Sequence, residues 1–370
     1  MNKLPTKNEI KEVLFNSNLR AAPGTDGITS LLYHDHWDIL GDSLHEVTTE
    51  IMKGNSPTLS QRTSLMVFGC KPKKMNSLLP SDKRRISLMN ADYKIVTGLE
   101  ASRFRKTQNH TLSPVQLNAG DDRRIHHGIN KARDCIQAVS KSKIGCALLD
   151  LDFVAAFDYT VLEWVLMVLR KKGLSEIVIN RIRNLYDNRI TVPVVNNITG
   201  TGLQNIRGTL AQGCPRSMNW FSYAIDPLLV YLLKRLQGIP IISLAVFGPQ
   251  EKDRNPPEPL TEQYKVLGYA DDVKPGVRSM SEFAIVDRAA TLFEQSSGNI
   301  LHRDPVKGKC KVLLLGRWRG TVEQEDIGFP HLRITDSLAF VGVHLQAKWQ
   351  KTRKEKNDQI QSRLKSTLGS

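Results

Sequence analysis

Two adjacent carboxylates interrupt an apolar stretch of the chain. The stretch runs from Val266 to Val273 and reads VLGYADDV. Valine, leucine and tyrosine favour β-strands, and an Ala-Asp-Asp sequence is typical of a tight turn between two strands. The pattern therefore predicts a hairpin with Asp271 and Asp272 at its tip. Neighbouring carboxylates repel each other unless one is protonated, solvent separates them or a metal ion binds them, so a solvated turn is the alternative to a metal site.

A further candidate carboxylate follows a strand-like segment upstream. The segment from Cys146 to Leu151 is mostly apolar and ends next to Asp152. The carboxyl end of a strand is where ligand sites of α/β sheets tend to form. Brought against Asp271 and Asp272, Asp152 would complete an all-oxygen site suited to Mg²⁺ or Mn²⁺. Two such ions about 3.5–4 Å apart are the recurring device for nucleotidyl transfer, in which one activates the attacking 3′-hydroxyl and the other steadies the pyrophosphate.

Three segments together resemble a known family. They are Tyr269-Ala-Asp-Asp272, Asp152-Phe-Val-Ala-Ala-Phe-Asp158 and Arg207-Gly-Thr-Leu-Ala-Gln-Gly-Cys-Pro215. In this order and spacing they are similar to the palm of reverse transcriptases, most of all those of non-LTR (LINE-like) retrotransposons. The resemblance covers the chain from about residue 20 to about residue 345. It implies an RNA-directed DNA polymerase with two Mg²⁺ or Mn²⁺ ions, an RNA template, a DNA primer or target, and dNTPs.

The resemblance also implies a fold and its division. The expected fold is α+β, the fingers and palm of a right-hand polymerase, with an antiparallel palm sheet backed by helices and an incomplete thumb. The expected regions are an N-terminal helical extension (1–19), fingers with part of the palm (20–140), the palm (141–345) with a surface loop at 248–263, and a basic start of a thumb or linker (346–370).

The metal ligands implied by the resemblance are Asp152, Asp271 and Asp272. Strand alternation puts Asp150 on the same face as Asp152, so the preference for Asp152 over Asp150 rests on the resemblance. Phe157 stands five residues after Asp152, where the family has an aromatic side chain that excludes the 2′-hydroxyl of ribonucleotides. Packing beneath the helix is the alternative role for this ring.

Other residues are expected to bind the incoming nucleotide. Residues 83–90, KRRISLMN, resemble the family's YRPISLLN, which puts Arg84 on its arginine and Arg85 in place of its proline. A guanidinium at the edge of a carboxylate site can hold triphosphate oxygens in a bidentate way, although generic backbone contact is the alternative. Lys309 falls on the lysine of the family's SKTE segment, near the pyrophosphate. The nucleotide set is Lys73, Arg84, Phe157, Gln212 and Lys309.

The template and primer set comes from further similar segments. Residues 20–28 resemble the PG-x-DGI segment near the template, and residues 340–344 resemble the primer-grip turn YLGV. Residues 112–125 depart from the family pattern and carry two aspartates, and Arg124 rather than these aspartates is the expected contact. A glycine in the third segment would let the backbone approach a base pair, because a Cβ would obstruct it. The set is Arg20, Arg124, Gly213, Tyr269 and Gly342.

Composition agrees with a polyanionic partner. The chain of 370 residues has 52 Lys and Arg against 37 Asp and Glu, a formal charge of +15. The basic residues form short clusters along the chain, which fits a groove for a nucleic-acid backbone, with solvated helix faces as the alternative. Five separated cysteines argue against disulfides or a zinc site. With no signal peptide and no membrane-length apolar run, we expect a nuclear or nucleocytoplasmic ribonucleoprotein and a place in a longer polyprotein.

Two other classes of protein fit parts of the sequence. A polymerase-derived RNA-binding scaffold without activity would be marked by the loss of a metal aspartate, and none is lost here. An intron-encoded maturase or an RNA-dependent RNA polymerase is the other class. Viral RNA polymerases usually carry Gly-Asp-Asp where this chain has Tyr-Ala-Asp-Asp, and Phe157 argues against the use of ribonucleotides.

Overall fold

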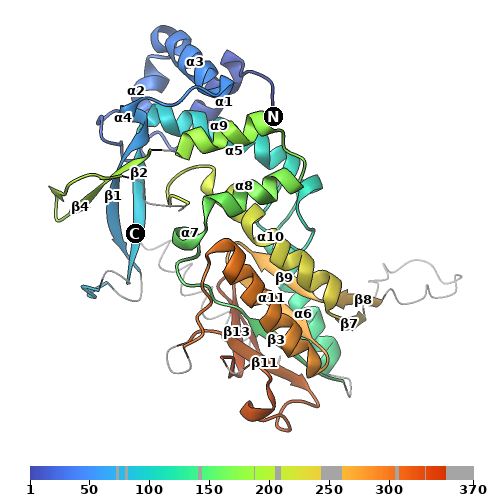
Figure 1. Ribbon diagram of the computed structural model, residues 1–370. Helices are drawn as coiled ribbons and strands as arrows, with labels where there is room; N and C mark the ends of the chain where they lie inside the picture. Colours follow the sequence, from blue (N-terminus) through green and yellow to red (C-terminus); the bar gives the residue numbers. More distant parts are fainter. Residues whose placement is uncertain are drawn as a thin grey trace, which may run out of the picture.

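The computed structural model describes residues 1–71, 75–79, 82–140, 144–186, 188–204, 210–242, 261–304, 308–329 and 331–346. In Figure 1 the N-terminal helices and a first sheet occupy the upper part of the molecule, and a second sheet lies in the lower part. Helices in the middle of the picture connect the two.

The N-terminal helices surround a small core of their own. They are α1 (Lys7–Phe15), α2 (Ser30–Asp35), α3 (Trp37–Lys53), α4 (Leu59–Arg62) and α5 (Ala91–Thr111). Helix α1 begins at a capping box, in which Thr6 and Glu9 exchange side-chain and backbone hydrogen bonds and satisfy two exposed amides of the first turn. Ile10 and Leu14 of this helix pack against Trp37 of α3. This packing anchors the predicted N-terminal extension to the helices that follow it.

The first sheet joins segments that are far apart in the chain. Its order is β2-β1-β4-β5, with β6 also paired to β4. The strands are β1 (Thr63–Cys70), β2 (Lys83–Met89), β4 (Ile190–Val195), β5 (Ile198–Thr199) and β6 (Leu203–Gln204). β1 pairs with β2 antiparallel and with β4 in parallel. Strands on both sides of residue 140 therefore build one sheet, whereas the predicted division between fingers and palm separates them.

The second sheet is the predicted antiparallel palm sheet. Its order is β12-β11-β3-β10-β9, and only the β11–β12 pair is parallel. The strands are β3 (Gly145–Asp150), β9 (Val266–Tyr269), β10 (Asp272–Val277), β11 (Lys311–Gly316) and β12 (Arg333–Ile334). Helices α6 (Ile125–Ser140), α10 (Ser217–Arg235) and α11 (Ser281–Ser297) pack on it and close the largest core. The prediction of an α+β palm backed by helices is confirmed.

Shorter elements complete the described chain. Helices α7 (Ala156–Tyr159), α8 (Leu162–Lys171) and α9 (Glu176–Tyr186) follow β3, and a 3-10 turn covers Gln324–Asp326. Two hairpins pair β7 (Ile239–Ile242) with β8 (Thr261–Tyr264) and β13 (Ser337–Phe340) with β14 (Val343–Gln346).

Two predicted regions overlap the described chain only at their edges. Of the predicted loop 248–263, residues 248–260 lie outside the described residues. Residues 261–263 belong to strand β8, because their backbone pairs with β7, so the predicted loop is wrong at that end. Of the predicted thumb start, all but residue 346 lies outside the description. Among the described residues, every helix is too short or too polar to span a bilayer.

A buried ionic network joins α5, α9 and the start of α10. Glu100 is fully buried and accepts from Arg181 Nε at 2.9 Å and from Arg216 Nη1 at 2.7 Å. Arg216 also donates to the hydroxyl of Tyr93 at 2.9 Å. Both guanidiniums are buried as well, so one carboxylate compensates two cations inside the protein.

Candidate active site

The predicted carboxylates converge through the pairing of β3 with β10. The two strands are antiparallel, and Leu151 lies opposite Val273 at the end of the ladder. This register places Asp152 opposite Asp272. Because side chains alternate along a strand, both aspartates project from the face opposite to that of Leu151 and Val273. Segments more than a hundred residues apart thus bring their acidic ends together at one edge of the palm sheet.

The Asp-Asp hairpin is tighter than predicted. Tyr269 pairs with Asp272, so the turn consists of Ala270 and Asp271 alone, and Asp272 is the first residue of β10. Ala270 has a φ of +52°, a left-handed conformation that costs energy for any residue other than glycine and that often occurs at functional sites. Burial by the surrounding protein raises the pKa of Asp271, and the charges of Asp272 and Asp152 raise it further. Because Asp152 lies opposite Asp272 in the register, Asp271 in the adjacent turn is at the same edge of the palm sheet.

Asp152 carries an oxygen that suits a cation. Its Oδ2 is buried and has no hydrogen-bond partner among the described residues. Lys309 Nζ lies 3.5 Å and His302 Nε2 3.6 Å from this oxygen, and Lys309 is largely exposed. Mg²⁺ is usually bound through one or two carboxylates with waters and substrate phosphates. The donor set of Asp152 and Asp271 fits that mode, although no group of three acidic, His or Cys side chains within the described chain forms a ready-made metal cage.

Asp272 and Asp150 are both held by a lysine that the sequence analysis missed. Lys274 Nζ donates to Asp150 Oδ1 at 2.5 Å and also to Asp272 Oδ1. The second oxygen of Asp272 accepts the N–H of Val341 at 3.1 Å. Burial raises the pKa of Asp150 to about 6, with Asp272 and Asp152 adding to the shift and Lys274 opposing it. A lysine within the apolar run after the two aspartates was the available signal.

The two arginines of β2 face opposite sides of the strand. Arg85 donates to Asp158, with Nη2 2.9 Å from Oδ2, so its face of β2 is turned toward the segment after Asp152. Arg84 is exposed, and strand alternation points it the other way. Arg84 therefore stays a prediction for the triphosphate, and Arg85 is the arginine that the structure brings to the palm. Lys73 lies outside the described residues.

The segment 210–215 connects β2 with the aromatic residue of the predicted gate. The backbone carbonyl of Gln212 accepts the N–H of Ser87 at 2.7 Å. Gly213 has a φ of +111°, and a Cβ there would lie 2.5 Å from the carbonyl oxygen of Ser87, so this glycine is required for contact with β2. Its approach to a base pair stays a prediction. Phe157 is half-buried and stacks on Phe221, with the ring centres 4.7 Å apart.

The remaining template and primer candidates are spread over the molecule. Arg20 and Arg124 are exposed, and none of the contacts among the described residues joins either one to the carboxylates. Arg123 instead binds carbonyl oxygens at the end of α5, including that of Ser113 at 2.6 Å. Tyr269 ends β9 beside the carboxylate turn. Gly342, with a φ of +77°, forms the β13–β14 turn together with the residue that donates to Asp272.

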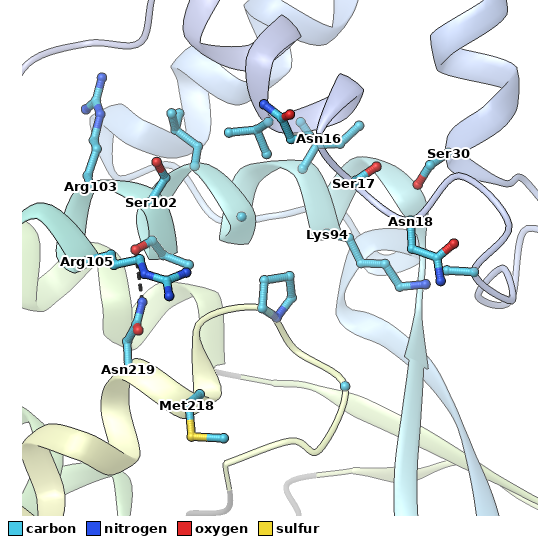
Figure 2. A pocket seen from close by; sticks show the side chains of 18 of the residues that line it. Asn16, Ser17, Asn18, Ser30, Lys94, Ser102, Arg103, Arg105, Met218 and Asn219 are labelled. Carbon is cyan, nitrogen blue, oxygen red and sulfur yellow. Dashed lines mark hydrogen bonds between the residues drawn. The ribbon is translucent and has the colours of Figure 1, made fainter. Parts of the chain in front are cut away.

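A groove of about 730 Å³ runs along α5 between α1 and the start of α10. Figure 2 shows amide and basic side chains around it, among them Asn18, Lys94, Arg105 and Asn219. The lining also includes Ser87 of β2 and Gly213, so one end of the groove lies where β2 contacts the segment 210–215. The lining residues include four basic side chains and two acidic ones, Glu9 and Glu12, and none of them is aromatic.

Comparison with known proteins agrees with this geometry. The family model described as reverse transcriptase (RNA-dependent DNA polymerase) matches residues 71–345, a range that contains every carboxylate of the site. The Transposon TX1 uncharacterized 149 kDa protein of Xenopus laevis is 29% identical over 234 residues. That match covers 63% of this chain and 18% of the relative, so the chain spans a small part of the relative's length. The resemblance seen in the sequence is confirmed, and the chain belongs to the reverse transcriptase family.

Proposed function

We propose that this chain is the RNA-directed DNA polymerase core of a non-LTR retrotransposon. It would add dNTPs to the 3′-hydroxyl of a DNA primer or target, guided by an RNA template. The observation that carries the proposal is the buried Oδ2 of Asp152, which accepts no hydrogen bond from the described residues and lies opposite the hairpin that presents Asp271. Asp152 and Asp271 are the proposed ligands of two Mg²⁺ or Mn²⁺ ions, and Asp272 is the third candidate.

Different residues of the chain would serve different steps of nucleotide addition. When bound, the divalent ions supply activation of the 3′-hydroxyl and neutralisation of the pyrophosphate charge. Lys309 offers an exposed ammonium 3.5 Å from Asp152 Oδ2, where it can attract the triphosphate. Phe157, fixed by its stack on Phe221, presents its half-exposed ring as the barrier to a 2′-hydroxyl.

The partners follow from the groove and from the charge of the chain. We assign the groove of Figure 2 to the single-stranded RNA template, because it combines amide and basic side chains and ends at Gly213. The excess of 15 positive charges would hold template and primer along their phosphates. The chain would act within a longer polyprotein, in a nuclear or nucleocytoplasmic ribonucleoprotein.

Primer extension tests the proposed function. The assay uses a poly(rA) template with an oligo(dT) primer and dTTP, with and without Mg²⁺. We expect extension that requires the divalent ion. Binding of poly(rA) without any extension in Mg²⁺ or Mn²⁺ would favour the alternative of an RNA-binding scaffold.

Replacement of Phe157 tests the proposed gate. Phe157→Ala is expected to raise the use of rUTP relative to dTTP about 10- to 100-fold, because it removes the ring that would clash with the 2′-hydroxyl. The measurement is the ratio of kcat/KM for the two nucleotides. Tyr159→Ala, which removes an exposed aromatic ring from the same short helix, should leave the ratio unchanged. An unchanged ratio in Phe157→Ala would leave this ring with a packing role only.

A further inference from the structure

Lys274 is a buried lysine inside the candidate active site that the proposed reaction does not use. Only 2% of the residue is exposed. Its ammonium binds Asp150 and Asp272 and lies 5.7 Å from the centre of the Phe340 ring. A buried charge is costly unless it is paired, and here two carboxylates and an aromatic face compensate it.

The register of the palm sheet fixes this arrangement. Since Leu151 lies opposite Val273, Asp150 lies directly opposite Lys274 on β10. The lysine is thus built into the sheet between two acidic strand ends, where a cation from solution would otherwise be needed to relieve their repulsion. The two carboxylates that it binds come from different strands, so it also ties β3 to the Asp-Asp hairpin.

The contacts of Lys274 extend to the β13–β14 turn. Val341 in that turn has a φ of +46°, a conformation that a β-branched residue rarely adopts and that surrounding contacts must hold in place. One such contact is its N–H bond to Asp272 Oδ2 at 3.1 Å, and its neighbour Phe340 lies near the Lys274 ammonium. Lys274 and Asp272 therefore connect the carboxylate hairpin with the turn predicted to grip the primer.

We propose that Lys274 is a positioning residue whose ammonium takes the place of a cation between Asp150 and Asp272. It holds the carboxylate hairpin in place before any divalent ion binds. It also orients Asp272 so that its second oxygen accepts the N–H of Val341 in the β13–β14 turn. Asp152 and Asp271 then remain as the carboxylates that face a divalent ion. This inference rests on the proposed function, because it divides the tasks within the same site.

Lys274→Ala tests the inference, because it removes the ammonium and leaves room for an ion between the two carboxylates. In chelator the variant is expected to melt about 5 °C or more below wild type, and Mn²⁺ should recover most of that loss. Wild type should gain clearly less from Mn²⁺ than the variant, since its hairpin is already assembled and Mn²⁺ adds only the stabilisation from binding at Asp152 and Asp271. Electron paramagnetic resonance of Mn²⁺ without nucleotide should count about one more bound ion in the variant.

Two further variants separate the inference from general effects of lysine loss. Lys311→Ala removes an exposed lysine from β11, whose backbone lies opposite Asp150 on its other side, and should behave as wild type. Lys274→Met removes the charge but fills the space, so it should lose stability and should gain no more from Mn²⁺ than wild type does. An equal Mn²⁺ count in Lys274→Ala and wild type would overturn the inference.

The Mn²⁺ count of Asp150→Asn decides the case even if Lys274→Ala does not fold. Because the Lys274 ammonium already occupies the space beside Asp150, this variant should bind as many Mn²⁺ ions as wild type, and a lower count would overturn the inference. None of these measurements requires DNA synthesis. If the chain gives the expected melting temperatures and Mn²⁺ counts but does not extend a primer, the role of Lys274 is supported and the proposed function is contradicted.

Discussion

Asp152→Asn is expected to slow dTTP incorporation by about a thousandfold or more while RNA binding remains as in wild type. The amide keeps the shape of the side chain but removes the negative charge from the oxygen that accepts no hydrogen bond from the described residues, so the attraction for a divalent ion is lost. The measurement is the single-turnover rate of primer extension, with template affinity from fluorescence anisotropy.

Asp150→Asn is the matched comparison for this prediction. Asp150 ends β3 and Asp152 follows it on the same face, but the carboxylate of Asp150 accepts a hydrogen bond from Lys274, whereas Oδ2 of Asp152 accepts none from the described residues. We therefore expect a clearly smaller loss of rate in Asp150→Asn than in Asp152→Asn. Equal losses, or synthesis that persists in Asp152→Asn, would contradict the ligand assignment.

Glu100→Gln is expected to lower the free energy of unfolding by about 3–5 kcal/mol, because it leaves two buried guanidiniums without a compensating charge. Arg181 and Arg216 both depend on this carboxylate, at 2.9 and 2.7 Å. Chemical denaturation followed by tryptophan fluorescence measures the change. Glu163→Gln is the control, since Glu163 forms an exposed pair with Arg183 and should cost less than about 1 kcal/mol. A loss in Glu100→Gln no larger than in the control would show that the network contributes little.

Local patterns in the sequence predicted much of the fold and part of the site. The helix in the N-terminal extension, the strand before Asp152 and the hairpin around Asp271 depend on neighbouring residues, and the structure has all three. The family resemblance added the order of the palm motifs. These features are readable because strand and turn preferences act over a few residues.

Features that depend on distant pairing could not be predicted in this way. The parallel contact of β1 with β4 carries no local signal, so the division at residue 140 separates strands of one sheet. The sequence around Lys274 does not distinguish it from other lysines, and only the pairing of β3 with β10 shows that Asp150 lies opposite it. In the same way, glycine is needed at position 213 because the carbonyl oxygen of Ser87 lies too close for a Cβ. Asp272 is held in position by the N–H of Val341, which is also distant in the sequence.

The parallel pairing of β1 with β4 also bears on how the chain is made. Residues 63–67 of β1 pair with residues 190–194 of β4. During synthesis β1 therefore leaves the ribosome long before β4, and one of its edges stays unpaired until β4 has been made. Such non-local pairing slows folding and prolongs the exposure of strand edges. A nascent chain stalled before residue 190 should therefore be sensitive to proteolysis within β1 and prone to aggregation, even though its N-terminal helices can already pack together.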